Sequence, residues 1–173
     1  MRTRTVLVPL LAGVALVTTA CGGAAVAGQG PAAAPSSGPA SPVQLTDAEV
    51  TDLFTSWNAA LATGDAQQVA DLYAPDAVLL STLSGDVKDT PEEIRGYFAD
   101  TFLPNRPQGE ITESYIAVER PGLATHTGLY DFTVTDPATG QQSVVPARFT
   151  YVYSQQPDGR WLISSHHSSK VPA

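Results

Sequence analysis

The side chains best suited to acid–base or metal chemistry are histidines near the C-terminus of this 173-residue chain. His166 and His167 are neighbours in a segment rich in β-forming residues, and neighbours on a strand point to opposite faces. They cannot bind one metal or line one pocket together unless a bulge intervenes. Alternation groups His167 with Ile163, and His166 with Leu162. We expect one histidine to be hydrogen-bonded in the core or an interface and the other to flank the sheet; a catalytic role for either is the alternative.

The third histidine, His126, shares strand parity with Tyr130 and Phe132 and is expected at the surface or in an interface. Three histidines without a clustered carboxylate make a poor zinc site, so no metal ligand is assigned. The sequence also has no Gly-rich dinucleotide loop and no phosphate loop, so no cofactor is expected.

Arg148 lies in the middle of a predicted strand between apolar neighbours. A cation inside a fold needs an acidic partner or a bound anion. One hypothesis is that Arg148 lines an anion-accepting pocket for a small carboxylate together with Tyr97, Tyr130 and His167. The alternatives are a structural pair between Arg148 and a carboxylate, or an Arg148 that faces outward.

The N-terminal segment 1–21 has the order of an export signal, with two arginines, a short apolar run over 6–17 and then small residues. The apolar run is shorter than the roughly 20 residues that a membrane-spanning helix needs. Its end resembles a bacterial lipobox, which makes Cys21 the expected lipid attachment point. The mature protein is then expected on the outer face of the bacterial cytoplasmic membrane. Free secretion after cleavage near Ala20 is the alternative.

Charge and cysteine content exclude several classes. The chain has 9 Lys and Arg against 17 Asp and Glu, a formal charge of −8, and loss of Arg2 and Arg4 with the signal changes this to −10. A nucleic-acid-binding protein would need a basic face instead. Membrane contact would come from acyl chains, because an acidic chain does not bind an anionic surface. The single cysteine excludes an intramolecular disulfide.

Composition divides the chain into three segments. Residues 1–21 are the predicted signal peptide. Residues 22–44 consist almost entirely of Ala, Gly, Pro and Ser, without charge or aromatic side chains, and are predicted to be a disordered tether. Residues 45–173 are predicted to fold as one domain, long enough for a single core.

Within that domain, local signals predict helices first and strands afterwards. Thr46 and Glu49 form a capping box for a helix that ends at Gly64. A second helix is predicted over 66–73, and a third begins at Pro91. Strands are predicted over 77–82, 111–119, 123–135, 143–155 and 160–168. This order predicts an α+β fold with an antiparallel sheet.

The motifs that carry a family resemblance lie at both ends of this domain. Segments 57–65 and 72–79 resemble the opening of the nuclear transport factor 2-like (SnoaL-like) superfamily. Segments 147–153, 158–163 and 166–169 resemble the association (hub) domain of calcium/calmodulin-dependent protein kinase II, and more closely its bacterial SgcJ/EcaC-type relatives. The resemblance implies a cone, in which helices close the concave face of a curved sheet and a pocket opens at the wide end. It also implies homodimers or larger rings.

The resemblance does not fix one chemistry, because this fold hosts isomerases, cyclases, dehydratases and non-catalytic modules. Ser81 stands where the ketosteroid-isomerase branch carries its base, and serine accepts no proton without a base of its own. The sequence therefore predicts an exported domain that binds a small ligand, a carboxylate being one candidate, or self-associates, with no catalysis assigned. The alternatives are an isomerase, cyclase or oxidoreductase-type enzyme on a small organic substrate, and a structural oligomerisation hub.

Overall fold

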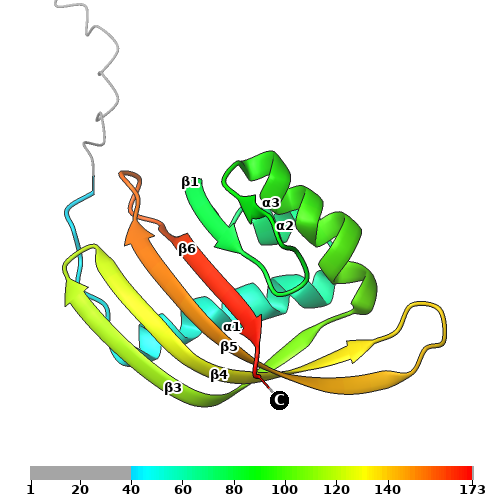
Figure 1. Ribbon diagram of the computed structural model, residues 1–173. Coiled ribbons are helices and arrows are strands. Elements are labelled where there is room, and N and C mark those ends of the chain that lie inside the picture. Colours follow the sequence, from blue (N-terminus) through cyan, green and yellow to red (C-terminus); the bar gives the residue numbers. More distant parts are fainter. Residues whose placement is uncertain (1–39, 173) are drawn as a thin grey trace, which may run out of the picture. The chain divides into compact units, whose positions relative to one another are not determined.

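The computed structural model describes residues 40–172 (Figure 1). The predicted signal peptide with Cys21, and most of the predicted tether, lie outside these residues. The elements are α1 (Asp47–Thr63), α2 (Ala66–Ala70), β1 (Tyr73–Leu80), β2 (Val87–Lys88), α3 (Pro91–Tyr97), the short helices η1 (Phe98–Phe102) and η2 (Leu103–Asn105), β3 (Gln108–Arg120), β4 (Leu123–Thr135), β5 (Gln142–Gln155) and β6 (Trp161–Lys170). None of the helices in this part of the chain is long and apolar enough to cross a membrane.

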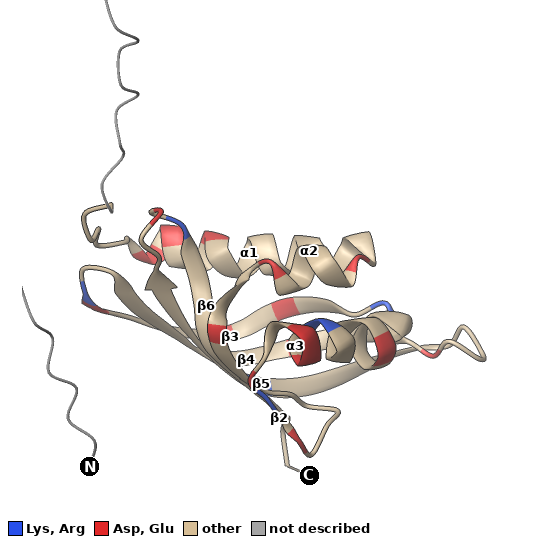
Figure 2. Cartoon of the chain, turned by 90° about the horizontal axis from the view of Figure 1, so that it is seen from above, with Lys and Arg blue, Asp and Glu red and all other residues tan. Residues whose placement is uncertain are grey.

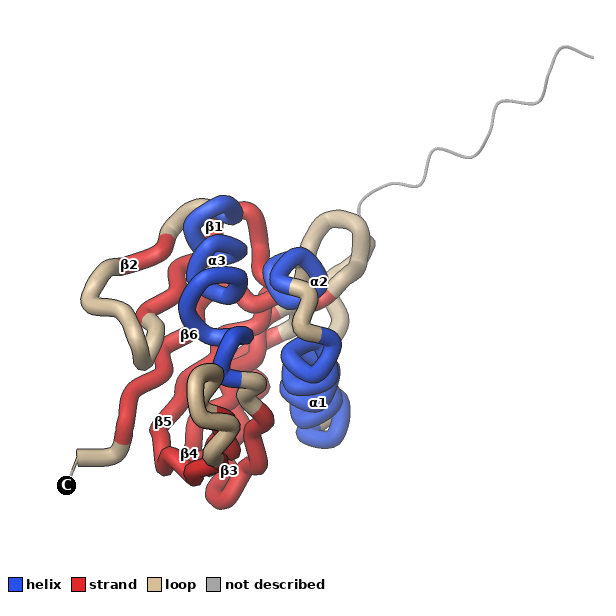
Figure 3. Tube along the Cα trace, turned by 90° about the vertical axis from the view of Figure 1, so that its right-hand side faces the viewer, coloured by secondary structure: helices blue, strands red, loops and turns tan. Residues whose placement is uncertain are grey.

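The strands form one curved sheet in the order β2-β1-β6-β5-β4-β3. Neighbouring strands pair antiparallel, except for the parallel pair of β1 and β6. Helices α1, α2 and α3 lie on the concave side of this sheet (Figures 1 and 3). The α+β cone is confirmed, and the parallel β1–β6 pair is its one departure from the predicted antiparallel sheet.

Helix α1 begins and ends where the sequence predicts. The Glu49 N–H donates to Thr46 Oγ1 at 3.3 Å, and the Glu49 carboxylate accepts from the Thr46 N–H at 2.8 Å. This capping box satisfies two N–H groups that the helix leaves free. Gly64 ends the helix with a φ of 71°, a conformation that favours glycine. The buried face of α1 consists of Val50, Phe54, Trp57 and Leu61.

Helix α2 is shorter than predicted, because the chain leaves it to join the sheet. It ends at Ala70, and Tyr73 begins β1 instead of closing the helix. The Ile163 N–H donates to the Leu72 carbonyl at 2.9 Å, and Tyr73 then pairs with Ile163. Pairing with β6 thus overrides the helical spacing of these residues. The strand predicted over 77–82 accordingly starts earlier.

A bulge in β6 determines which histidine faces the core. The register between β5 and β6 shifts around Ser164, whose hydroxyl donates to a β5 carbonyl oxygen at 3.1 Å. One extra residue reverses the alternation of side chains beyond it. His166 is buried and His167 is exposed, although Ile163 is buried too. The predicted grouping of His167 with Ile163 is therefore wrong, whereas the division of the two histidines between opposite faces is correct.

Residues 40–44, which the sequence assigns to the tether, lie along two hairpin turns. The Val43 N–H donates to Gln155 Oε1 at 2.7 Å, and the Val43 carbonyl accepts from the Gly122 N–H at 2.8 Å. These partners are far away in the sequence, so composition alone could not place them beside Val43. Contacts with the domain therefore begin before the predicted start at residue 45.

Candidate functional site

The four predicted ligand residues lie on two faces of the sheet. Tyr97 and Tyr130 are buried on the concave side, where both border a small cavity. Arg148 and His167 are exposed and border a hollow on the outer face. Arg148 points outward because it alternates with the buried neighbours Ala147 and Phe149. The four residues therefore do not share one pocket, and Arg148 is the outward-facing residue that the sequence left as an alternative.

The inner cavity lies in the hydrophobic core, among aromatic side chains. Its volume is about 10 Å³, roughly the space that one water molecule needs. The polar residues that border it are Ser81, Thr82, Tyr97, Tyr130, His166 and Ser168. The cavity in this conformation is thus too small for an organic ligand, although its polar lining could hydrogen-bond one.

A chain of hydrogen bonds crosses the core from α1 to β6. Trp57 Nε1–H donates to the Tyr73 hydroxyl oxygen at 3.1 Å, and that oxygen lies 2.8 Å from His166 Nδ1. Burial raises the pKa of Tyr73 well above its ordinary value, so this phenol keeps its proton. Because the Trp57 N–H can only donate, His166 Nδ1 is the acceptor for the Tyr73 O–H. His166 is therefore neutral and carries its proton on Nε2.

Burial keeps His166 in this neutral form. The side chain is 3% exposed, and its ring stacks on Tyr151 with the ring centroids 4.0 Å apart. Burial, and to a lesser degree the charge of His167, lowers the pKa of His166 from 6.5 to about 3. Within the described residues, Nε2 has no hydrogen-bond partner. His166 thus contributes an unused N–H donor to the lining of the cavity.

Hydroxyl groups complete the polar lining. The Ser168 hydroxyl lies 2.5 Å from both the Thr82 hydroxyl and the Tyr130 hydroxyl. Burial raises the pKa of Tyr97 to about 12. The tyrosines are therefore neutral hydrogen-bonding groups near pH 7. Among the described residues no carboxylate borders the cavity, and Ser81 lies in its wall, where the resemblance would have placed a carboxylate base.

His126 lies in the core, which corrects its predicted place at the surface or in an interface. It is fully buried, and its ring packs edge-on against Phe149 with the centroids 5.0 Å apart. Its Nε2 lies 2.8 Å from the Ser114 hydroxyl. The described residues contain no group of three His, Cys, Asp or Glu that could hold a metal ion.

The hollow on the outer face lies over the middle of β3, β4, β5 and β6. Its volume is about 460 Å³, and Glu113, Leu129, Arg148 and His167 lie along it. Arg148 Nε donates to the Ser169 hydroxyl at 3.1 Å. Arg148 makes no ion pair with any residue that the structure describes. This face therefore presents a cation that no described residue neutralises.

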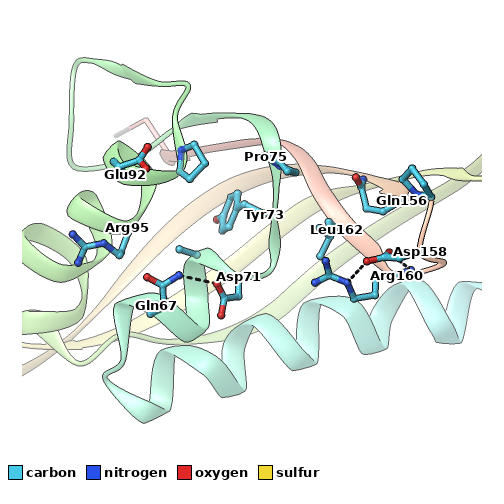
Figure 4. A pocket seen from close by; sticks show the side chains of 13 residues that line it. Gln67, Asp71, Tyr73, Pro75, Glu92, Arg95, Gln156, Asp158, Arg160 and Leu162 are labelled. Carbon is cyan, nitrogen blue, oxygen red and sulfur yellow. Dashed lines mark hydrogen bonds and ion pairs between the residues drawn. The ribbon is translucent and has the colours of Figure 1, made fainter.

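A second, wider depression lies between the helices and the β5–β6 turn (Figure 4). Its volume is about 770 Å³. The Arg160 guanidinium pairs with Asp158 at 2.8 Å on one side, and Arg95 lies on the other. Acidic residues are spread over α1 and α3 as well (Figure 2). The depression is open to solvent and mixes both signs of charge, so it does not select one ligand class.

Sequence reasoning missed Tyr73 as a hydrogen-bond partner in the core and His166 in the cavity wall. Tyr73 was expected on a helix, and strand alternation without the bulge gave His166 no place there. No residue type in the run of serines around His166 indicates the bulge that turns its side chain toward the core. Its hydrogen bond with Tyr73 depends on the parallel β1–β6 pairing, which no local pattern in the sequence indicates.

Comparisons with known proteins agree with this geometry. The sequence model of the calcium/calmodulin dependent protein kinase II association domain matches residues 46–172. A crystal structure assigned to that association domain, from Xanthomonas campestris, is 45% identical, with a TM-score of 0.70, and the alignment covers 79% of this chain and 96% of that one. No curated protein matches the sequence significantly.

More distant structures share the fold alone. A nuclear transport factor 2-like superfamily protein from Salmonella enterica is 16% identical, with a TM-score of 0.64 and coverage of 73% of this chain and 91% of that chain. A ketosteroid isomerase-like protein from Erwinia carotovora is 18% identical, with a TM-score of 0.61 and coverage of 73% and 96%.

Proposed function

Since the chain belongs to the calcium/calmodulin-dependent protein kinase II association-domain family, we propose that it functions by self-association through the outer face of its sheet. One observation carries this proposal. The helices of the described part lie on the concave side, so none of residues 40–172 forms a helix over the outer face of β3 to β6 (Figure 3). A sheet normally buries the faces that carry its larger side chains.

The residues of this face suit contact with another sheet. Tyr115 is 64% exposed there, and Leu129 and Val152 are half-buried. Thr127 and Thr150 lie between them, with their hydroxyls 3.4 Å apart. Aromatic and β-branched side chains on a pleated surface pack well against a second such surface. The tightly filled interior also favours a role for the outer surface over one for the cavity.

Light scattering on the full chain tests self-association. We expect a dimer or larger assembly at micromolar concentration, and we expect Thr127→Arg to reduce its mass by placing a long cation in the middle of the face. Thr55→Arg is the matched control, because Thr55 is an exposed residue of α1. A wild-type chain that stays monomeric, or equal dissociation by both variants, would contradict the proposal.

A small-molecule role is the second candidate, and the unused His166 N–H supports it. Since Ser81 Oγ has no hydrogen-bond partner among residues 40–172 either, the cavity offers two buried polar atoms to a ligand. Such a ligand would need a hydrogen-bond acceptor, as a small carboxylate has, and the segment Tyr97–Phe102 would have to move outward to admit it. Titration with acetate and butyrate, followed through the His166 ring signals, tests this role. Binding that survives His166→Phe, or that is lost in Arg148→Ala on the other face, would exclude a cavity site.

Export and lipid attachment are proposed from the sequence of residues 1–21 alone. In a bacterial host, incorporation of labelled palmitate into the wild-type chain but not into Cys21→Ser would support the lipid anchor. Equal labelling, or release of the wild-type chain into the medium, would favour free secretion instead.

A further inference from the structure

Three residues form a straight row across the outer face. Glu113 on β3 pairs with Leu129 on β4, and Leu129 pairs with Arg148 on β5. Paired residues on adjacent strands share a face and lie about 5 Å apart. Leu129 is therefore flanked by an acid on one side and a cation on the other, each one strand away.

Neither Glu113 nor Arg148 forms an ion pair with another residue of the described part of the chain. Arg148 donates only to the Ser169 hydroxyl, through Nε, and forms no ion pair with any residue between 40 and 172. Glu113 accepts from the Tyr115 hydroxyl at 2.5 Å, which holds its carboxylate on the exposed surface. One strand, β4, separates the two residues, and Leu129 of that strand lies between them. The row thus offers one fixed acid and one free guanidinium to an approaching partner.

These charges distinguish two ways of packing a second copy face to face. A two-fold axis lying between the sheets and along β4 exchanges β3 with β5, so Glu113 of each copy meets Arg148 of the other. An axis across the strands keeps each strand opposite itself, so Glu113 would meet Glu113 and Arg148 would meet Arg148. The first arrangement pairs opposite charges twice, and the second opposes like charges twice.

We propose that two copies associate about a two-fold axis along β4, with reciprocal Glu113–Arg148 pairs on either side of a central Leu129–Leu129 contact. This inference rests on the proposed self-association and specifies its geometry. Packed sheets lie about 10 Å apart, within reach of an extended arginine and a glutamate. The twist of each sheet gives aligned packing at about 30°, which suits an axis near the strand direction. In the neighbouring row, Tyr115 then meets Thr150 of the other copy.

Charge reversal on the full chain tests this axis through the dimer dissociation constant. We expect Glu113→Arg and Arg148→Glu each to weaken association about tenfold or more, because each creates two like-charge contacts. The double variant restores both pairs with reversed polarity and should return to within about threefold of wild type. Glu92→Arg and Arg95→Glu make the same charge changes on α3 and should leave the constant unchanged.

A milder variant separates the two axes without reversing a charge. Glu113→Gln should weaken association if its partner is Arg148, whereas it should tighten association if its partner is a second Glu113. Circular dichroism confirms that each variant is folded. A wild-type dimer that neither reversal affects, or a double variant as weak as the singles, would overturn this geometry while leaving self-association intact. A wild-type monomer would instead overturn the proposed function, and this inference with it.

Discussion

The Tyr73 hydroxyl lies 2.8 Å from Nδ1 of His166, and through this contact one residue links the surface to the core. The Tyr73 side chain borders the wide depression between the helices and the β5–β6 turn. Its hydroxyl meanwhile accepts from the Trp57 N–H inside the cone. Tyr73 thus lies in the wall of the depression, while its hydroxyl holds the proton of His166 on Nε2.

Tyr73→Phe should destabilise the fold, because it deprives two buried groups of their partner. The Trp57 N–H and His166 Nδ1 would both lose the hydroxyl, and an unsatisfied buried polar group costs about 1–3 kcal/mol. Urea unfolding followed by tryptophan fluorescence measures the loss. Tyr115→Phe is the control, since its hydroxyl contacts an exposed carboxylate and its removal should change stability by less than about 0.5 kcal/mol. Similar effects of both variants would contradict the importance of the buried chain.

Stability should fall as the pH drops below 6.5, because the native state holds His166 neutral. The pKa of His166 is about 3 in the fold against 6.5 in the unfolded chain. Below pH 6.5 the unfolded chain therefore binds a proton at His166, whereas the native state does not. The contribution is complete above pH 6.5 and decreases toward pH 3, at up to about 1.4 kcal/mol per pH unit. Unfolding free energies between pH 7 and 5 measure it.

Two variants test which histidine causes this pH dependence. His166→Phe should flatten the slope between pH 6.5 and 5, whereas His167→Gln on the exposed face should leave most of it. Burial also lowers the pKa of His126, so a smaller slope of the same sign should remain in His166→Phe. The carboxylates of Asp65 and Asp158, whose hydrogen bonds lower their pKa, contribute only at more acidic pH. An unchanged slope in His166→Phe would show that His166 is not the group responsible.

Local signals in the sequence predicted the local parts of this fold. The capping box at Thr46 and Glu49 and the left-handed Gly64 placed α1 correctly, because caps depend on residues within one turn. The resemblance of the family motifs predicted the cone-shaped fold. Features that depend on long-range pairing were missed. Tyr73 lies in β1 and not in its predicted helix because β1 pairs with β6. Local propensity carries no information about such a contact.

The candidate site was only half predictable for the same reason. Tyr130 was expected in a pocket and does border the cavity, since alternation along β4 is regular. Arg148 was proposed beside it because its neighbours are apolar, but those neighbours define the opposite face of the strand. His167 was expected on the concave face, but the extra residue of the bulge at Ser164 places His166 there instead. No residue type in that run of small polar side chains identifies the bulge in advance.

Thr46→Ala should weaken the start of α1. The Thr46 hydroxyl accepts from the Glu49 N–H, and the Glu49 carboxylate bonds to both the hydroxyl and the backbone N–H of Thr46. Loss of a capping threonine costs about 1 kcal/mol. Chemical denaturation should show this loss, while Thr55→Ala in the middle of α1 should cost less, because its hydroxyl only donates to the Thr51 carbonyl. Equal costs would argue against the capping box.

Gly128→Ala should destabilise the sheet, while Gly96→Ala should not. A Cβ at position 128 would lie 1.9 Å from the Glu113 carbonyl oxygen and 3.1 Å from Phe149 Cζ, and a backbone oxygen in a paired strand cannot move aside freely. Overpacking of this kind costs about 1–3 kcal/mol. A Cβ at Gly96 meets nothing within 4 Å, and alanine in a helix is favoured over glycine by about 0.5–1 kcal/mol. Thermal unfolding of the two variants should therefore give shifts of opposite sign. A Gly128→Ala variant as stable as wild type would show that β3 does not approach β4 as closely as this register requires.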